Sequence, residues 1–418
     1  MPTSLRLWSM CISANLGGLL VGLHLALFSG ILEMPSFTKD MPFDLTPPIK
    51  SVITSALVLG FIAGAIPAGP LCDKYGRRVA LMITAALFLS STIAMAFARK
   101  LYQLVLARLV AGLGYAVANV TCTLYTAEVA PPQVRGILVN LYQLLITVGI
   151  FASQSVNALI WEHGQWTTPV WLATIPAALM LILVFLLVTE SHVWETRPSS
   201  EERKTTLLDV WKSASGRKRL VIGCGLAVSQ QLTGINAIIF FGPALVSDVL
   251  KLETSSAPFI AAAIIGAANV LATVASLGIV ERFGRRVLLL TAGPPMISSL
   301  LVIGAMRGEI VPTNRTLGVG ALLLFVISFA IAYGPVPFLI IAEIFPVAYK
   351  GTAMGFCSLV LATACLGLGA FFLPALKVFG GYVFGFFAIS VAVSSWFVFT
   401  KVPETRNLTL DEVDELLS

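Results

Sequence analysis

The sequence predicts an all-α membrane protein in which twelve transmembrane helices form two pseudo-symmetric bundles of six. Three observations lead to this fold class: the composition, the recurrence of long apolar runs, and motifs that repeat in the two halves. Of the 418 residues, 57% are hydrophobic and 11% are charged, and the mean hydropathy is +0.91. Soluble domains carry about 25% charged residues. The composition therefore indicates an integral membrane protein.

Apolar runs of about 18 to 25 residues recur along the whole chain, and each could cross roughly 30 Å of hydrocarbon. A transmembrane β-barrel would instead show apolar residues at every second position, so these runs indicate helices. The first run is too long for a signal peptide and lacks a cleavage pattern, so we expect it to remain as the first span. The runs cover residues 8–30, 51–71, 79–98, 102–126, 138–160, 169–189, 219–247, 257–280, 287–306, 317–342, 352–374 and 382–400.

The basic residues predict the orientation. With both termini in the cytoplasm, about 18 of the 27 Lys and Arg residues lie on the cytoplasmic side, as the positive-inside rule requires. We expect a multi-pass protein of the plasma membrane. The net charge of +6 fits contact with an anionic leaflet and needs no nucleic-acid partner. The six cysteines follow neither a disulfide framework nor a metal-ligand spacing.

Acidic motifs of the first half of the chain recur in the second half, each at nearly the same number of residues further on, which indicates an internal duplication. The segment DKYGRR is echoed by ERFGRR, and EVAP is echoed by EIFP. The matched acidic residues are Asp73 and Glu281, Glu128 and Glu343, and Glu190 and Glu404. The predicted organisation is an N-terminal bundle (1–189), a shortened cytoplasmic linker (190–218), a C-terminal bundle (219–400) and a cytoplasmic tail (401–418). A short amphipathic helix is expected from Leu207 to Trp211 in the linker.

Three carboxamides, Gln230, Gln231 and Asn236, lie in the seventh apolar run. An unpartnered polar side chain inside a membrane costs a few kcal/mol, so we expect something to occupy these groups. Helical spacing allows them to converge on one cavity. A carboxamide offers donors and an acceptor together, which suits a neutral ligand rich in hydroxyls better than an ion. The alternative is that the amides join neighbouring helices.

Five motifs lie along the chain: the two acidic-x-x-Gly-Arg-Arg loops, the segment 230–236 between them, Gly334-Pro335-Val336-Pro337, and Pro403-Glu404-Thr405-Arg406. Together they resemble the sugar porter family of the major facilitator superfamily, which includes the facilitative glucose transporters. The resemblance covers nearly the whole chain. It implies the major facilitator fold, with the substrate at mid-membrane between the two halves.

The resemblance also implies roles for individual residues. Hexose contacts are expected from Gln143, Gln230, Gln231, Asn236 and Asn269, with Phe338 where many glucose facilitators have Trp. Gly334, Pro335 and Pro337 interrupt the tenth run, because two prolines remove two backbone donors; this helix is expected to kink and gate the site, although a passive kink is the alternative.

The resemblance further implies that charged residues at the cytoplasmic helix ends pair across helices when the protein is open to the outside. Ordinary positive-inside anchoring is the alternative, and it leaves the neighbouring acids unexplained. The expected network comprises Asp73, Arg77, Arg78, Glu128, Arg135 and Glu190, with Glu281, Arg285, Arg286, Glu343, Lys350, Glu404 and Arg406.

His24 stands where proton-coupled members of the family often carry Asp and facilitators often carry Asn. A proton-linked role is one interpretation, because imidazole titrates near neutrality. A neutral histidine bonded to a neighbour is the other, and the one favoured. Asn314 lies in an Asn-Arg-Thr glycosylation sequence in a short loop expected on the outside.

The predicted function is passive, bidirectional transport of a monosaccharide, with glucose or another hexose as the expected sugar, by alternating access. A proton-coupled symporter that uses His24 and a non-transporting sugar sensor are the alternatives. The sequence offers no candidate nucleophile, metal cluster or phosphate-binding glycine loop, so neither an enzyme nor a cofactor is expected. The expected partners are a sugar and the lipid bilayer, and a monomer is sufficient for transport.

Overall fold

The computed structural model describes residues 5–195, 207–251, 256–346 and 350–406, together with 412, 415 and 416. Across these residues the secondary structure is helical, and twelve segments are long and apolar enough to cross a membrane. They correspond one by one to the twelve predicted runs. The predicted fold class is confirmed.

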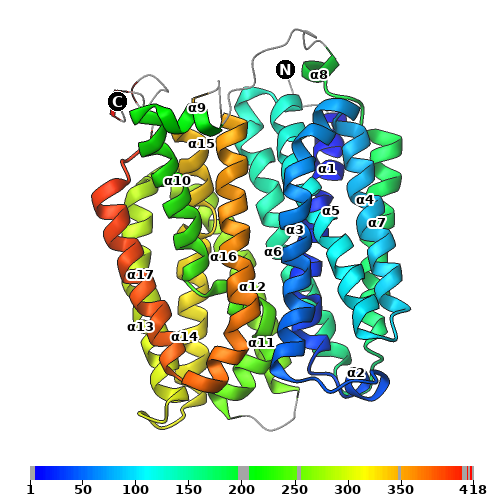
Figure 1. Cartoon of the computed structure of the whole chain (residues 1–418), viewed down its shortest axis with the longest axis vertical. Helices are drawn as coiled ribbons and strands as arrows, with labels where there is room; N and C mark the ends of the chain where they lie inside the picture. Colours follow the sequence, from blue (N-terminus) through cyan, green and yellow to red (C-terminus); the bar gives the residue numbers. More distant parts are fainter. Residues whose placement is uncertain are drawn as a thin grey trace. The chain divides into compact units, whose positions relative to one another are not determined.

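The chain divides into two compact units, of which the first comprises Met1–Pro198, Ile238–Ser247 and Leu252–Ala267. Its N-terminal helices, shown from blue to green in Figure 1, are α1 (Leu5–Ile31), α2 (Pro35–Asp40), α3 (Pro47–Tyr75), α4 (Arg77–Ala96), α5 (Leu101–Val129), α6 (Pro132–Ile160), α7 (Thr167–Leu187) and α8 (His192–Glu195). Helix α1 packs against α5, α6 and α7, and α5 also packs against α3 and α4. Gly22 of α1 permits close contact, because a Cβ there would overlap the main chain of α6 at Ile146.

The second unit comprises Ser199–Ala237, Asp248–Lys251 and Ala268–Ser418. Within it, α13 packs against α14 and α17, and α10 packs against α15, α16 and α17. Its helices, shown from green to red in Figure 1, are α9 (Leu207–Lys212), α10 (Ala214–Leu232), α13 (Arg285–Arg307), α14 (Arg315–Ser328), the π-helix η1 (Phe329–Tyr333), α15 (Val336–Ile344), α16 (Lys350–Phe379) and α17 (Tyr382–Lys401). The helices α11 (Ile235–Leu250) and α12 (Ala257–Phe283) contribute residues to both units.

The seventh apolar run is two helices rather than the single one expected. Helix α10 ends at Leu232 and α11 begins at Ile235, with Gly234 at a φ of +87° between them. A positive φ is readily adopted only by glycine, so Gly234 allows the chain to turn inside the membrane. The break places Gln230 and Gln231 on α10 and Asn236 on α11.

The tenth run is interrupted as predicted. Helix α14 passes into η1, whose last turn is closed by a hydrogen bond from Gly334 N to Phe329 O of 2.8 Å, and α15 follows after Pro335. In the linker, α9 forms where the short helix was predicted, whereas residues 196–206 lie outside the described part of the chain.

Candidate functional site

Gln230, at the end of α10, is bonded to the interrupted tenth run. Its Nε2 donates to Tyr333 O and to Gly334 O, both at 2.8 Å. In a continuous α-helix, Tyr333 O would accept from the N–H of residue 337, but Pro337 has none. The side chain of Gln230 therefore supplies a donor that proline cannot, and it ties α10 to the kink.

The two other amides of the motif bond to each other. Asn236 Nδ2 donates to Gln231 Oε1 and lies 3.2 Å from Cys365 Sγ on α16. Gln230, Gln231 and Asn236 are each at most 9% exposed. Their bonds to the described residues leave three polar atoms unused, Gln230 Oε1, Gln231 Nε2 and Asn236 Oδ1, and none of the three atoms is fully buried. Two acceptors and one donor group, all uncharged, are thus available to a hydroxyl-rich ligand.

Among the described residues, no hydrogen bond joins Asn269 or Phe338, the other predicted sugar contacts of the second unit, to this group. Asn269 of α12 is 7% exposed and accepts from Thr273 through its main-chain oxygen. Gln143 of α6 is half-buried, as is Phe338 of α15. Their contact with a sugar stays a prediction.

Gln154 of α6 is an amide that the sequence interpretation missed. It is 3% exposed, and its Oε1 has no hydrogen-bond partner within the described residues. A Cβ placed at Gly266 of α12 would collide with that oxygen. Gln154 follows Gln143 by eleven residues, or three helical turns, so both lie on one face of α6. That spacing was a usable signal.

His24 of α1 lies in a fully buried pocket beside Arg108 of α5. Its Nε2 is 3.3 Å from the hydroxyl of Thr92, and that hydroxyl donates to Phe88 O, so Nε2 is assigned as the N–H donor of a neutral ring. Arg108 donates to the main-chain oxygens of Ile53 at 2.6 Å, Thr54 at 3.3 Å and His24 at 3.4 Å.

The ring of Phe28 lies 4.7 Å from the Arg108 guanidinium. No carboxylate belongs to the contacts of Arg108 in the described part of the chain. A second positive charge on His24 would be both buried and repelled by Arg108, which favours the neutral ring.

The charged residues of the first unit meet at the start of α4. Arg77 Nη2 lies 2.8 Å from Glu128 Oε1, and its Nη1 lies 3.4 Å from Asp73 Oδ1. Glu190 accepts from the main-chain N–H groups of Arg77 at 2.7 Å and Arg78 at 3.2 Å. The glutamate was expected to pair with side-chain charges; instead it caps the N-terminus of α4, where free N–H groups attract an anion.

The second unit repeats this arrangement at the start of α13. Arg285 Nη2 lies 3.0 Å from Glu343 Oε1, and Glu404 accepts from the main-chain N–H of Arg285 at 2.8 Å and of Arg286 at 3.0 Å. The helix is preceded by Gly284 at a φ of +92°, as α4 is preceded by Gly76 at +89°. Equal contacts at equal positions agree with the duplication inferred from the sequence.

Other members of the expected network are engaged differently. Arg135 Nε donates to Ala130 O at 3.2 Å, and Arg406 N donates to Glu404 Oε1 at 3.1 Å. Burial lowers the pKa of Lys350, and the nearby Glu343 carboxylate opposes that shift. The side chain of Glu281 lies outside the described residues.

Two of the surface grooves formed by the described residues contain none of these amides in their lining. One lies between α13 and α14, and the other lies at the end of α6 around Trp161.

Comparison with known proteins identifies the family. The family described as "Sugar (and other) transporter" matches residues 10–208 and 193–417. The chain belongs to the sugar porter family. This sugar porter is 30% identical to the glucose transporter GlcP of Staphylococcus epidermidis over 96% of this chain and 95% of that protein. It is 30% identical to the galactose-proton symporter of Escherichia coli over 98% of this chain and 94% of that one.

Among solved structures, a crystal structure of a D-xylose-proton symporter is 27% identical, with a TM-score of 0.82 over 96% of this chain and 99% of that chain. The sugar porter is therefore an integral, multi-pass membrane protein of the major facilitator superfamily that transports a sugar. Proteins of this family are transporters, not enzymes.

Proposed function

We propose that this sugar porter carries a hexose, with glucose as the first substrate to test, by alternating access and without a coupled ion. The observation that carries the proposal is the group of unused amide atoms on Gln230, Gln231 and Asn236, which offers hydrogen bonds but no charge. A sugar that enters a membrane-embedded site must exchange its water bonds for protein bonds, each worth about 0.5–1.5 kcal/mol net. GlcP, one of the relatives, is named as a glucose transporter.

Alternating access requires helices that can change shape near the site. The break at Gly234 and the π-helix η1 supply two such places, and Gln230 joins them. We propose that the chain comprises an N-terminal half (1–189) and a C-terminal half (219–400), and that Gln143, Gln154, Asn269 and Phe338 also contact the sugar. On this proposal the two acidic clusters face the cytoplasm and both termini are cytoplasmic, in the plasma membrane.

The choice of a facilitator rests on the surroundings of His24. A proton-coupling group must gain and lose a proton during transport, whereas His24 is fully buried beside the permanent charge of Arg108. Proton symport is the second candidate, because the relatives include proteins named as proton symporters for galactose and arabinose.

Counterflow in proteoliposomes tests both the transport of glucose and the absence of a coupled proton. Vesicles loaded with unlabelled D-glucose should take up labelled D-glucose at the same rate with and without a protonophore, and L-glucose should not exchange. Accumulation against a sugar gradient only when the outside is acidic, abolished by His24→Asn, would establish the symporter instead. Saturable binding of hexose without exchange would overturn transport of that sugar.

A further inference from the structure

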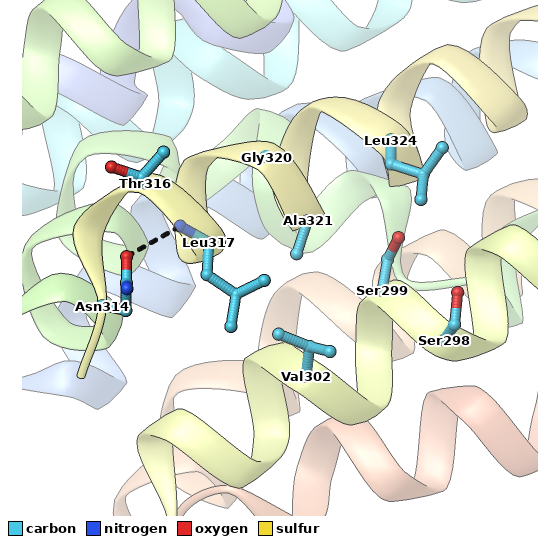
Figure 2. A pocket seen from close by; sticks show the side chains of 9 residues that line it. All are labelled: Ser298, Ser299, Val302, Asn314, Thr316, Leu317, Gly320, Ala321 and Leu324. Carbon is cyan, nitrogen blue, oxygen red and sulfur yellow. Dashed lines mark hydrogen bonds between the residues drawn. The ribbon is translucent and has the colours of Figure 1, made fainter. Parts of the chain in front are cut away.

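The groove between α13 and α14 has the shape and lining of a site for an apolar chain. Its volume is about 500 Å³, within the range of about 300–1,000 Å³ that is typical of small-molecule sites. Val302, Leu317 and Leu324 line it together with small residues of both helices. Figure 2 shows these side chains between the two ribbons, with Asn314 and Thr316 at one end and Ser298 and Leu324 at the other.

Three polar side-chain atoms in the groove are already engaged. The hydroxyls of Ser298 and Ser299 donate to Pro295 O at 3.0 and 2.7 Å, and Asn314 Oδ1 accepts from Leu317 N at 3.1 Å. The serines therefore act as small side chains that leave room rather than as ligands for a polar molecule.

The groove opens on the surface of its unit, within membrane-spanning helices. Leu317 and Leu324 are 47% and 45% exposed, and a Cβ added at Gly320 would meet nothing within 4 Å. Both helices are long and apolar enough to cross a membrane, so the medium outside this face is hydrocarbon. From Thr316 to Leu324 the groove extends roughly 12 Å, most of one leaflet of the hydrocarbon core.

Arg315 lies in the sequence between Asn314 and Thr316, two residues that line the groove. Arg315, in the first turn of α14, is exposed and forms no ion pair within the described residues. Two other basic groups at this end are paired, Arg307 with Asp248 and Lys251 with Glu309 at 2.6 Å, whereas Lys377 in the last turn of α16 is exposed and forms no ion pair within the described residues. A cation in the first turn of a helix is also disfavoured by the helix dipole. An anion beside Arg315 would supply the missing ionic partner and would interact favourably with the dipole.

We propose that this groove binds a phospholipid with an anionic headgroup, its acyl chain lying along Gly320 and its phosphate beside Arg315. The leaflet is the one on the side away from Glu404, because α13 begins next to that residue and ends at Arg307. The site is separate from the sugar-binding amides and does not depend on which sugar is carried.

The test uses the full chain in phosphatidylcholine vesicles that contain a trace of phosphatidylglycerol or phosphatidylcholine with a photoreactive acyl chain. After illumination, adducts are mapped by mass spectrometry. Adducts in α13 and α14 should be about fivefold more frequent with phosphatidylglycerol, the effect of one basic residue beside an anionic lipid. Equal labelling by the two lipids would overturn the proposal.

Variants distinguish the contribution of the groove to lipid binding from the contribution of the charge on Arg315. Gly320→Leu and Ser298→Leu fill the groove from opposite helices, and either should remove the adducts. Gly278→Leu is the matched control, since a Cβ at Gly278 of α12 also meets nothing within 4 Å. Arg315→Gln should abolish the preference for phosphatidylglycerol, whereas Lys251→Gln should keep it. Adducts that persist in both groove-filling variants, or an equal loss of preference in the two charge variants, would refute the site.

Discussion

The side-chain nitrogen of Gln230 lies 2.8 Å from the main-chain oxygen of Tyr333, an oxygen that Pro337 deprives of its usual helical donor. The same nitrogen reaches Gly334 O. The glutamine that resembles a sugar contact is thus also a structural part of the kink.

Gln230→Leu should destabilise the protein as well as weaken transport. The substitution leaves two buried carbonyl oxygens without this donor, at a cost of about 1–3 kcal/mol in the free energy of unfolding. Thermal unfolding in detergent measures the change. Gln143→Leu is the control, since the half-buried side chain of Gln143 forms no hydrogen bond within the described residues, and equal midpoints for the two variants would contradict the assigned role of Gln230.

Gln231→Ala should reduce hexose uptake about tenfold, which corresponds to about 1.4 kcal/mol for one lost buried contact. Initial rates of uptake at low sugar concentration measure it. Gln165→Ala removes an exposed amide in the loop before α7 and should leave uptake unchanged. Unaltered uptake in the Gln231 variant would remove that residue from the site.

The matched capping contacts of Glu190 and Glu404 lead to a paired prediction. Glu190→Gln and Glu404→Gln each replace an anion at a helix N-terminus by a neutral amide, and each should lower stability by about 0.5–2 kcal/mol. Because the contacts are alike, the two losses should agree within experimental error. A loss confined to one variant would mean that the two halves are not equivalent in energy.

Gly284→Ala should be more damaging than its size suggests. At a φ of +92° and ψ of 162° an alanine is strained, and its Cβ would lie 2.8 Å from Glu404 Oε2. Strain in this region amounts to about 1–3 kcal/mol. Gly385→Ala in α17 meets nothing within 4 Å and should be neutral or slightly stabilising. Unfolding midpoints of the two variants provide the comparison, and a tolerated Gly284→Ala would argue against this backbone geometry.

Cys224 of α10 and Cys357 of α16 are in side-chain contact, so mild oxidation should join them. Copper phenanthroline is expected to yield a disulfide that mass spectrometry detects as a linked pair of peptides. Cys357→Ser should prevent it and Cys365→Ser should not. A link from Cys224 to Cys365 instead would place α16 in a different register.

The twelve spans and the internal duplication could be predicted, because length, apolarity and repeated motifs are properties of the sequence itself. The break at Gly234 could not, since a single glycine inside an apolar run is also compatible with a continuous helix. Nor could the capping by Glu190: a glutamate near two arginines suggests ion pairs, and only the three-dimensional placement shows that it faces the main-chain N–H groups.

For the amides, too, the sequence predicts the type of site but not the contacts of individual atoms. Their type and spacing indicated a polar pocket, but which atoms face other protein groups depends on the path of the tenth run. The spacing of Gln154 from Gln143 could have been used to predict that both lie on one face of α6, whereas the proximity of Gln154 to Gly266 of another helix is not visible in the linear order.

The wide turn of η1 holds one residue more than an α-helical turn would. If that turn tightened to the α-helical form, every residue after it would rotate by roughly 100° about the axis. Phe338 would then lie on a different face of the helix, and the hydrogen bonds from Gln230 to the two main-chain oxygens would break. The two hydrogen bonds from the side chain of Gln230 therefore favour the π-helical form of this turn over the α-helical one.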